Sequence, residues 1–200
     1  MSEVRSPDRG DSHAAPLVAA VLINVAMGVI YVWSLFLLPL ETFLARPRAD
    51  LSIVASVALV AFTIGVVVHD RLLKRLGSVR FTALAFACAA GGHLLFAVLA
   101  TYPGLVLGYG VLFGLGAGLG YGLALALATA VPDRLRALAI GMAMAAFASS
   151  GIVLPLLLGP LIRAASPPAS FAAIGAGMLL AGLLVAGLLR RAAKDRSVDG

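Results

Sequence analysis

The chain has little charge over most of its length. Asp, Glu, Lys and Arg together make up only 12% of its 200 residues, about half the share found in soluble domains. Hydrophobic residues account for 62%, so the folded chain does not have enough polar side chains to cover itself with a water-compatible surface. This composition excludes an ordinary soluble domain and predicts a protein that lies in a lipid bilayer.

Residues that form disulfides or hold metals are equally scarce. Cys88 is the one cysteine, which excludes a disulfide within the chain. The three histidines, His13, His69 and His93, lie far apart in the sequence. We therefore expect no metal site and no cofactor.

Long apolar runs are what the chain does have. Helices cross a hydrocarbon core of about 30 Å with roughly 20 residues, and continuous rather than alternating hydrophobicity favours helices over a barrel. The sequence therefore predicts an all-α six-helix transmembrane domain over residues 16–190, between a disordered cytoplasmic N-terminus (1–15) and a disordered cytoplasmic tail (191–200). Six runs contain no charged residue: 16–40, 51–69, 81–100, 104–131, 137–162 and 170–189. The first run is too long for a cleaved signal peptide, and we interpret it as a retained helix.

Basic residues divide unequally between the two sides that this topology defines. Twelve of them lie in the N-terminal segment, the second and fourth connections and the tail, and only Arg46, Arg48 and Arg163 lie on the other side. Because basic connections stay in the cytoplasm, we expect both termini there and a multi-pass protein of the plasma (inner) membrane. The same bias explains the net charge of +6 without a nucleic-acid partner, so the lipid bilayer is the expected partner.

Polar and aromatic residues gather in the second half of the first run. Asn24 lies one turn before Gly28, and an amide in a membrane helix needs a hydrogen-bond partner, so it should face the bundle or a wet cavity. Tyr31 lies about 22 Å along the helix from Pro16 at 1.5 Å per residue. Tyr31 and Trp33 therefore lie deeper than residues of an interfacial aromatic belt.

The fourth and fifth runs carry many small residues. Gly110, Gly114, Gly118 and Gly122 recur at four-residue spacing, which places them on one helix face and favours close packing with another helix. No predicted strand precedes them, which excludes a dinucleotide-binding loop. The fifth run contains Ser149 and Ser150 without the glycine-flanked serine of an intramembrane protease, so we do not expect an enzyme.

His93 is an ionisable side chain in the middle of the third run. Such a residue within a membrane span is a candidate functional group, and the usual pKa of histidine suits proton coupling. A structural hydrogen bond to a neighbouring helix is the alternative. Both interpretations stay open at this point.

The connection between the second and third runs is rich in charge and ends in a glycine. Asp70 is the one acid among several bases, which predicts a charge network that clamps two helix ends, with Gly77 allowing a tight turn. The pattern of Gly65, Asp70-Arg71, Gly77 and Arg80 resembles the loop between helices two and three of the major facilitator superfamily. The resemblance implies a gating role for these residues.

Two further motifs resemble the oxalate/formate antiporter and monocarboxylate transporter branch of that superfamily. One is the glycine, tyrosine, tryptophan and proline pattern from Gly28 to Leu40. The other is the proline-acid-base turn that contains Pro132, Arg134 and Arg136, for which the resemblance also implies a gating role. In the superfamily, helices one and four line the cavity. The resemblance therefore nominates these residues for the substrate pathway: Asn24, Tyr31, Trp33, Tyr109 and Tyr121.

Superfamily transporters usually have two six-helix halves around a site near the midplane, and this chain resembles the N-terminal half. The resemblance implies a homodimer or a second six-helix half. Our first hypothesis is a half-size transporter that moves a small organic solute, with monocarboxylate anions as candidates, by alternating access. No Lys or Arg lies within a run to neutralise a carboxylate, so a neutral solute, or an anion held by tyrosine hydroxyls and helix ends, stays open. Our second hypothesis is a non-transporting membrane interaction or assembly subunit, or a fragment of a split transporter.

Overall fold

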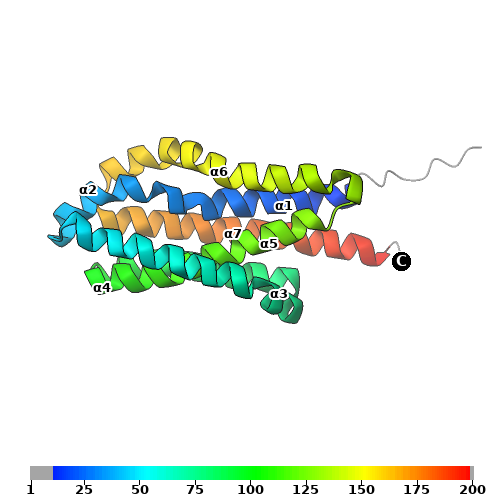
Figure 1. The fold of residues 1–200 in the computed structure, drawn as a ribbon, viewed down its shortest axis with the longest axis horizontal. Helices are drawn as coiled ribbons and strands as arrows, with labels where there is room; N and C mark the ends of the chain where they lie inside the picture. Colours follow the sequence, from blue (N-terminus) through cyan, green and yellow to red (C-terminus); the bar gives the residue numbers. More distant parts are fainter. Residues whose placement is uncertain (1–10, 199–200) are drawn as a thin grey trace, which may run out of the picture.

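The computed structural model describes the backbone of residues 11–198 and the side chains of residues 14–194. Every element in this part of the chain is a helix, and the long helices run side by side along one axis (Figure 1). This confirms the predicted all-α bundle. In chain order the elements are α1 (Asp11–Met27), the 3₁₀ segment η1 (Gly28–Val32), α2 (Trp33–Leu44), α3 (Arg48–Leu99), α4 (Tyr102–Leu105), the π-helical segment η2 (Val106–Phe113), α5 (Gly114–Thr129), α6 (Asp133–Ala164) and α7 (Pro167–Val198).

The number of separate long helices differs from the prediction. The described residues contain five helical stretches long and apolar enough to cross a membrane: Ala14–Leu44, Arg48–Leu99, Tyr102–Thr129, Asp133–Ala164 and Pro167–Lys194. The predicted count of six is therefore not confirmed. The difference arises in α3, which joins the second and third apolar runs in one element of 52 residues. Residues 71–76 are mostly Arg, Leu and Lys, which favour helix, so the expected loop is helical up to Gly77.

Helix α3 nevertheless changes direction at Gly77. Its φ of 72° and ψ of 163° lie outside the helical region, and a positive φ is easily adopted only by glycine. Gly114 of α5 lies against Ala58, whereas Gly116 lies against Ala89. A straight helix would separate those two α3 residues by about 46 Å, so α3 must fold back on itself. We call residues 48–76 its first arm and residues 78–99 its second arm.

The helices at the two ends of the chain extend beyond the apolar runs. Helix α1 begins at Asp11, inside the segment expected to be disordered, of which residues 1–10 lie outside the described part. Helix α7 continues to Val198, so the described part of the tail is helical rather than disordered. No glycine or proline lies between Leu189 and Val198, and the Ala, Arg and Lys residues there favour helix.

Helix α5 packs between the two arms of α3, at the level where its glycines lie. A Cβ atom on Gly118 would overlap the carbonyl oxygen of Phe62 in the first arm, and a Cβ on Gly116 would lie 2.5 Å from the backbone nitrogen of Ala89 in the second. The four glycines of the predicted row all face the first arm. The residues nearest to Gly110, Gly114, Gly118 and Gly122 are, in that order, Val57, Ala58, Phe62 and His69.

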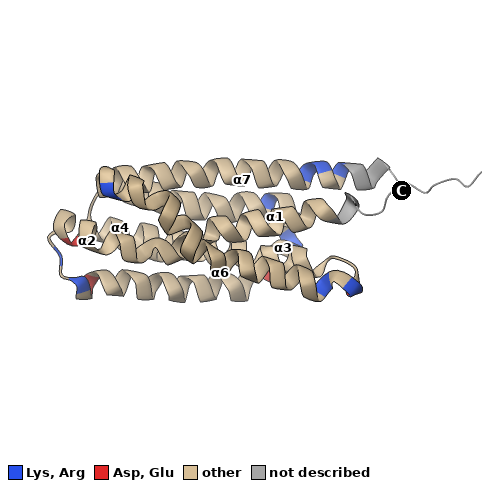
Figure 2. Cartoon of the chain, turned by 90° about the horizontal axis from the view of Figure 1, so that it is seen from above, with Lys and Arg blue, Asp and Glu red and all other residues tan. Residues whose placement is uncertain are grey.

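Large apolar side chains cover the outside of the bundle. Val67, Ile152, Leu156 and Leu184 are each more than 70% exposed. Exposing such a surface to water would cost free energy, whereas exposing it to the hydrocarbon tails of lipids would not. Basic residues lie at the two ends of the bundle and leave the middle of its length uncharged (Figure 2). The chain is therefore a multi-pass membrane protein.

Candidate functional site

Two segments of the bundle depart from α-helical geometry. Segment η1 (Gly28–Val32) interrupts the first span as a 3₁₀ turn, and η2 (Val106–Phe113) interrupts the span from Tyr102 to Thr129 as a π-helix of eight residues. Each segment contains glycine, which weakens helical preference. Because π-helical segments are rare and occur often at functional sites, this region is the first place to look for one.

The two irregular segments contact each other through Tyr109 of η2. Its hydroxyl group donates a hydrogen bond of 3.4 Å to the carbonyl oxygen of Ile30 in η1. Its ring stacks on the ring of Trp33, the first residue of α2, with centroids 4.7 Å apart. Tyr109 itself is buried. One side chain therefore joins the irregular parts of two different spans.

An apolar cavity of about 300 Å³ lies beside this contact, at the lower end of the size range of small-molecule sites. Tyr31 is 48% exposed, so the cavity is open toward the outside of the bundle. The lining contains no charged residue, and the described part of the chain contains no group of His, Cys, Asp or Glu residues that could hold a metal. The lining residues are Ile30, Tyr31, Trp33, Ala55, Ala58, Leu59 and Tyr109.

Three of the five predicted pathway residues, Tyr31, Trp33 and Tyr109, meet at this cavity. Asn24 lies elsewhere: it is fully buried, and its Nδ2 donates a hydrogen bond of 2.6 Å to the carbonyl oxygen of Ala143. That bond joins α1 to α6, which is the interhelical role that an amide within a membrane span requires.

Tyr121, the fifth predicted residue, belongs to a second aromatic cluster next to the cavity. Its ring lies 4.8 Å from that of Phe147 in α6 and 5.7 Å from that of Phe62 in the first arm of α3. Phe147 also meets the edge of Tyr31, with centroids 5.2 Å apart. Sequence reasoning missed Phe62 and Phe147, because phenylalanines in apolar runs carry no local signal that they meet.

His93 lies behind Tyr109 rather than at the cavity. It is fully buried, and its Nδ1 lies 2.9 Å from the carbonyl oxygen of Ala89, so Nδ1 carries the proton and donates it. The Nε2 atom has no hydrogen-bond partner among the described residues. The imidazole ring meets the edges of Phe113 and Tyr109, with centroids 4.6 Å and 5.7 Å away.

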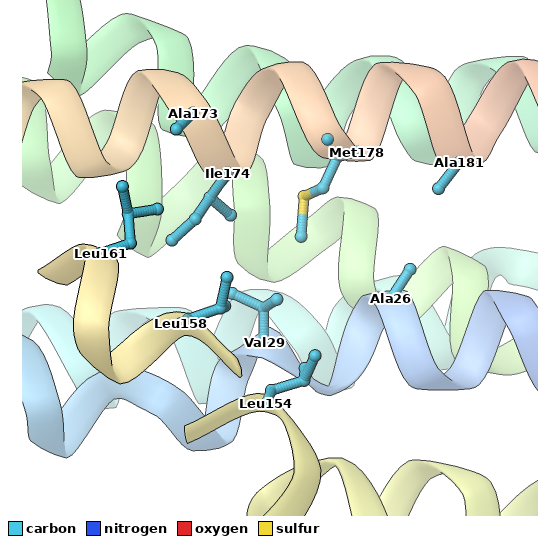
Figure 3. Close-up of a pocket in the computed structure, with 10 residues that line it drawn as sticks. Ala26, Val29, Leu154, Leu158, Leu161, Ala173, Ile174, Met178 and Ala181 are labelled. Carbon is cyan, nitrogen blue, oxygen red and sulfur yellow. The ribbon is translucent and has the colours of Figure 1, made fainter. Parts of the chain in front are cut away.

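A second apolar cavity, of about 190 Å³, lies between α1, η1, α6 and α7. In Figure 3, Ile174 and Met178 of α7 point toward Leu158 of α6 and Val29 of η1. The residues that line it are nine apolar residues and one glycine. A cavity without a polar or aromatic group has nothing to orient a solute, so it is the weaker candidate for a binding site.

The packing of η1 against α6 depends on Gly28. A Cβ atom at this position would overlap both side-chain atoms of Ser150. Ser150 is fully buried, and its hydroxyl group donates a hydrogen bond to the carbonyl oxygen of Phe147 in its own helix. The contact therefore joins a glycine of one helix to a small side chain of another.

Residues predicted to gate the protein surround the bend of α3. Asp70 forms an ion pair of 2.6 Å with Lys74, one turn away on the same arm, and both side chains are more than half exposed. The acid therefore pairs within one helix and not across two helix ends. Arg71 and Arg80 are exposed. Gly65 packs against α5, where a Cβ would lie 2.6 Å from the carbonyl oxygen of Leu115.

The other predicted gating residues lie where α6 begins. Pro132 immediately precedes the helix, and Arg134 and Arg136 lie exposed in its first turn. Arg136 forms an ion pair of 2.5 Å with Asp133, and its Nε donates a hydrogen bond of 3.2 Å to the carbonyl oxygen of Thr129 at the end of α5. Arg136 thus connects the end of one helix to the start of the next.

Comparison with known proteins identifies a family for nearly all of the chain. A sequence profile of the Major Facilitator Superfamily matches residues 17–200, from the first apolar run to the last residue. Comparison with curated proteins finds no match.

Proposed function

Since this chain belongs to the Major Facilitator Superfamily of membrane transporters, we propose that it carries a small organic solute across the membrane by alternating access. The observation that carries the proposal is the cavity where η1 and η2 meet. Helical transporters commonly bind their solutes beside interrupted helices. Here two interrupted spans supply Tyr31, Trp33 and Tyr109 to one cavity.

We propose that the chain crosses the plasma (inner) membrane six times, with both termini in the cytoplasm. The two arms of α3 would be the second and third crossings, because each contains an apolar run of at least 19 residues. Most basic residues lie in the N-terminal segment, at the bend of α3, in the first turn of α6 and in the tail, which supports the cytoplasmic orientation.

We propose that a second six-helix half, either another copy of this chain or a separate chain, closes the open side of the cavity. Exposed hydroxyl groups on the first arm of α3 support this. Ser52, Ser56 and Thr63 each donate a hydrogen bond to the carbonyl oxygen four residues earlier. Small hydroxyl residues on the outside of an apolar span are typical of surfaces where membrane helices pack together.

The remaining sequence predictions assign roles around this cavity. The resemblance to the oxalate/formate antiporter and monocarboxylate transporter branch makes monocarboxylates the first anions to test. His93 is the proposed proton-coupling residue, since its Nε2 is buried and its ring contacts Tyr109. The residues around Asp70 and Arg136 are the proposed gates.

Uptake into proteoliposomes tests the proposal. We expect the purified chain to take up at least one labelled solute, from a panel of monocarboxylates and uncharged small molecules, faster than empty vesicles do. Ala55→Phe should abolish this uptake because the new ring fills the cavity. Ala87→Phe, on the exposed side of the second arm, is the matched control and should keep it.

Two results would count against transport through this cavity. Equal uptake by wild type and Ala55→Phe would place the pathway elsewhere. A folded protein that takes up no member of the panel would instead favour the non-transporting subunit or the split-transporter fragment.

A further inference from the structure

The polar and charged groups around the Tyr109 cavity define the class of solute that it can hold. We infer that this solute is an uncharged aromatic compound with one hydroxyl or N–H group, and not a carboxylate anion. The inference rests on the proposed function, because it takes this cavity to be the place where the transported solute binds.

The charges around the cavity do not suit an anion. None of the seven lining residues is basic. A carboxylate loses the favourable free energy of its hydration on burial, and no cation in the lining would compensate for that loss. The basic residues that follow α2 are already matched with acids. Arg48 makes two hydrogen bonds of 2.6 Å and 3.1 Å to the carboxylate of Glu41, and Arg46 pairs with Asp50 at 3.5 Å.

The rings of the cavity suit a flat apolar solute. Trp33 and Tyr109 stack on each other with an interplanar angle of 29°, and Tyr31 lies on the exposed side. Aromatic rings stack in offset or edge-on arrangements more favourably than their buried area alone explains. The first arm of α3 contributes the small residues Ala55 and Ala58 to the lining, which leaves room for a ring beside these side chains.

The polar contact between Tyr109 and Ile30 at the cavity suits a single donor on the solute. The hydrogen bond from Tyr109 to the carbonyl oxygen of Ile30 is long, at 3.4 Å, and therefore weak. A carbonyl oxygen has two lone pairs, and the helical backbone bond uses one of them, so a hydroxyl or N–H group of a solute can take the other in place of Tyr109. A solute with a carboxylate would bring only acceptors to this position.

Trp33 makes the inference directly measurable, because it is the only tryptophan in the chain. The full-length chain in nanodiscs would be titrated at pH 7.5 with benzyl alcohol, cyclohexylmethanol and benzoate while its tryptophan fluorescence is recorded. We expect a saturable change with benzyl alcohol. Cyclohexylmethanol should bind about three- to tenfold more weakly, because it cannot stack, and benzoate should give no saturable change.

Two variants separate binding in the cavity from partition into lipid. Ala55→Phe should lose the saturable response to benzyl alcohol, and Ala87→Phe should keep it, with both variants first shown to unfold at the wild-type temperature. Ala55→Leu replaces Ala55→Phe if the larger residue prevents folding. A response of equal size in wild type and in the cavity-filling variant would overturn the inference.

The outcomes also separate this inference from the proposed function. Saturable binding of benzoate that is as tight as that of benzyl alcohol would overturn the solute class and leave the cavity as a transport site. Saturable binding of benzyl alcohol without uptake of any solute by proteoliposomes would support the ligand class and contradict transport. A saturable response to none of the three compounds would overturn the inference, whereas the uptake panel would still test transport.

Discussion

Helix α5 meets the first arm of α3 through backbone atoms, whereas the first span meets η2 through aromatic side chains. In the first contact, Gly118 faces the carbonyl oxygen of Phe62, and Gly65 faces that of Leu115. In the second, the rings of Trp33 and Tyr109 stack beside a cavity. The first surface leaves no room for an added methyl group, and the second leaves room for a small molecule.

The difference indicates which part of the bundle is fixed and which part moves. Glycine allows two backbones to approach closely, and such a contact cannot slide without collision. Stacked rings and a long hydrogen bond can separate and form new contacts at little cost in free energy. We therefore interpret the glycine contacts of α3 with η2 and α5 as the scaffold, and the contact that η1 and Trp33 make with Tyr109 as the part that changes during transport.

The largest expected effect comes from adding one methyl group to the scaffold. Gly118→Ala would place a Cβ against the backbone carbonyl oxygen of Phe62. We expect the free energy of unfolding to fall by about 2 kcal/mol or more, measured by unfolding in detergent or nanodiscs. Phe62→Ala should not rescue it, since the obstacle is backbone.

Gly141→Ala is the control for that variant. Gly141 lies within α6, and a Cβ there meets no atom within 4 Å. Its stability should be unchanged or raised by up to about 1 kcal/mol, because alanine favours helix more than glycine does. Equal losses in the two variants would mean that glycine contacts do not define the scaffold.

Where η1 meets α6, we expect a loss of stability that a second substitution can partly reverse. Gly28→Ala would collide with the side chain of Ser150, with an expected loss of about 1–3 kcal/mol. Because the obstacle is a side chain, Ser150→Gly in the same chain should recover at least half of that loss, as a double-mutant cycle of unfolding free energies would show. Purely additive losses would contradict the contact.

A smaller effect on stability, with a large effect on function, is expected at His93. His93→Gln keeps an N–H donor near the carbonyl oxygen of Ala89 and should cost about 1 kcal/mol or less. If His93 couples transport to protons, solute accumulation driven by a proton gradient should be lost, while solute exchange without a gradient continues. Wild-type accumulation in this variant would exclude the coupling role.

The smallest effect on stability is expected at Asp70. Its ion pair with Lys74 is exposed, and exposed pairs of this spacing contribute about 0.5 kcal/mol or less. Asp70→Asn should therefore unfold like wild type but exchange solute more slowly if the bend of α3 is a gate. Lys74→Gln removes the same pair and is the control: slowing in both variants would assign the effect to the pair, and normal rates in both would exclude it.

Much of the scaffold could be predicted from sequence because its signals are local. Each uncharged run falls almost wholly within one helical stretch of the structure, and the four-residue spacing places Gly110 to Gly122 on one face. The continuity of α3 could not be predicted in the same way. A single glycine at position 77 is compatible with a loop or with a bend, and only the packing of both arms on α5 decides between them.

The candidate site was only partly predictable, because it depends on contacts between distant segments. Tyr31, Trp33 and Tyr109 stand out as aromatic residues within the first and fourth runs. Ala55 and Phe147 do not stand out, since alanine and phenylalanine are ordinary in apolar helices. The 3₁₀ and π-helical geometry has no clear local signal either, and it arises where Tyr109 and Ile30 meet.

Hydrogen–deuterium exchange of the full-length chain in nanodiscs tests most directly whether η1 moves against a fixed α5. Both segments lie inside apolar spans, so α5 serves as the control for η1. We predict that amides of residues 28–32 exchange at least about tenfold faster than those of residues 114–122, because locally mobile segments open more often. Equal protection of the two segments would contradict the division of this bundle into a scaffold and a moving part.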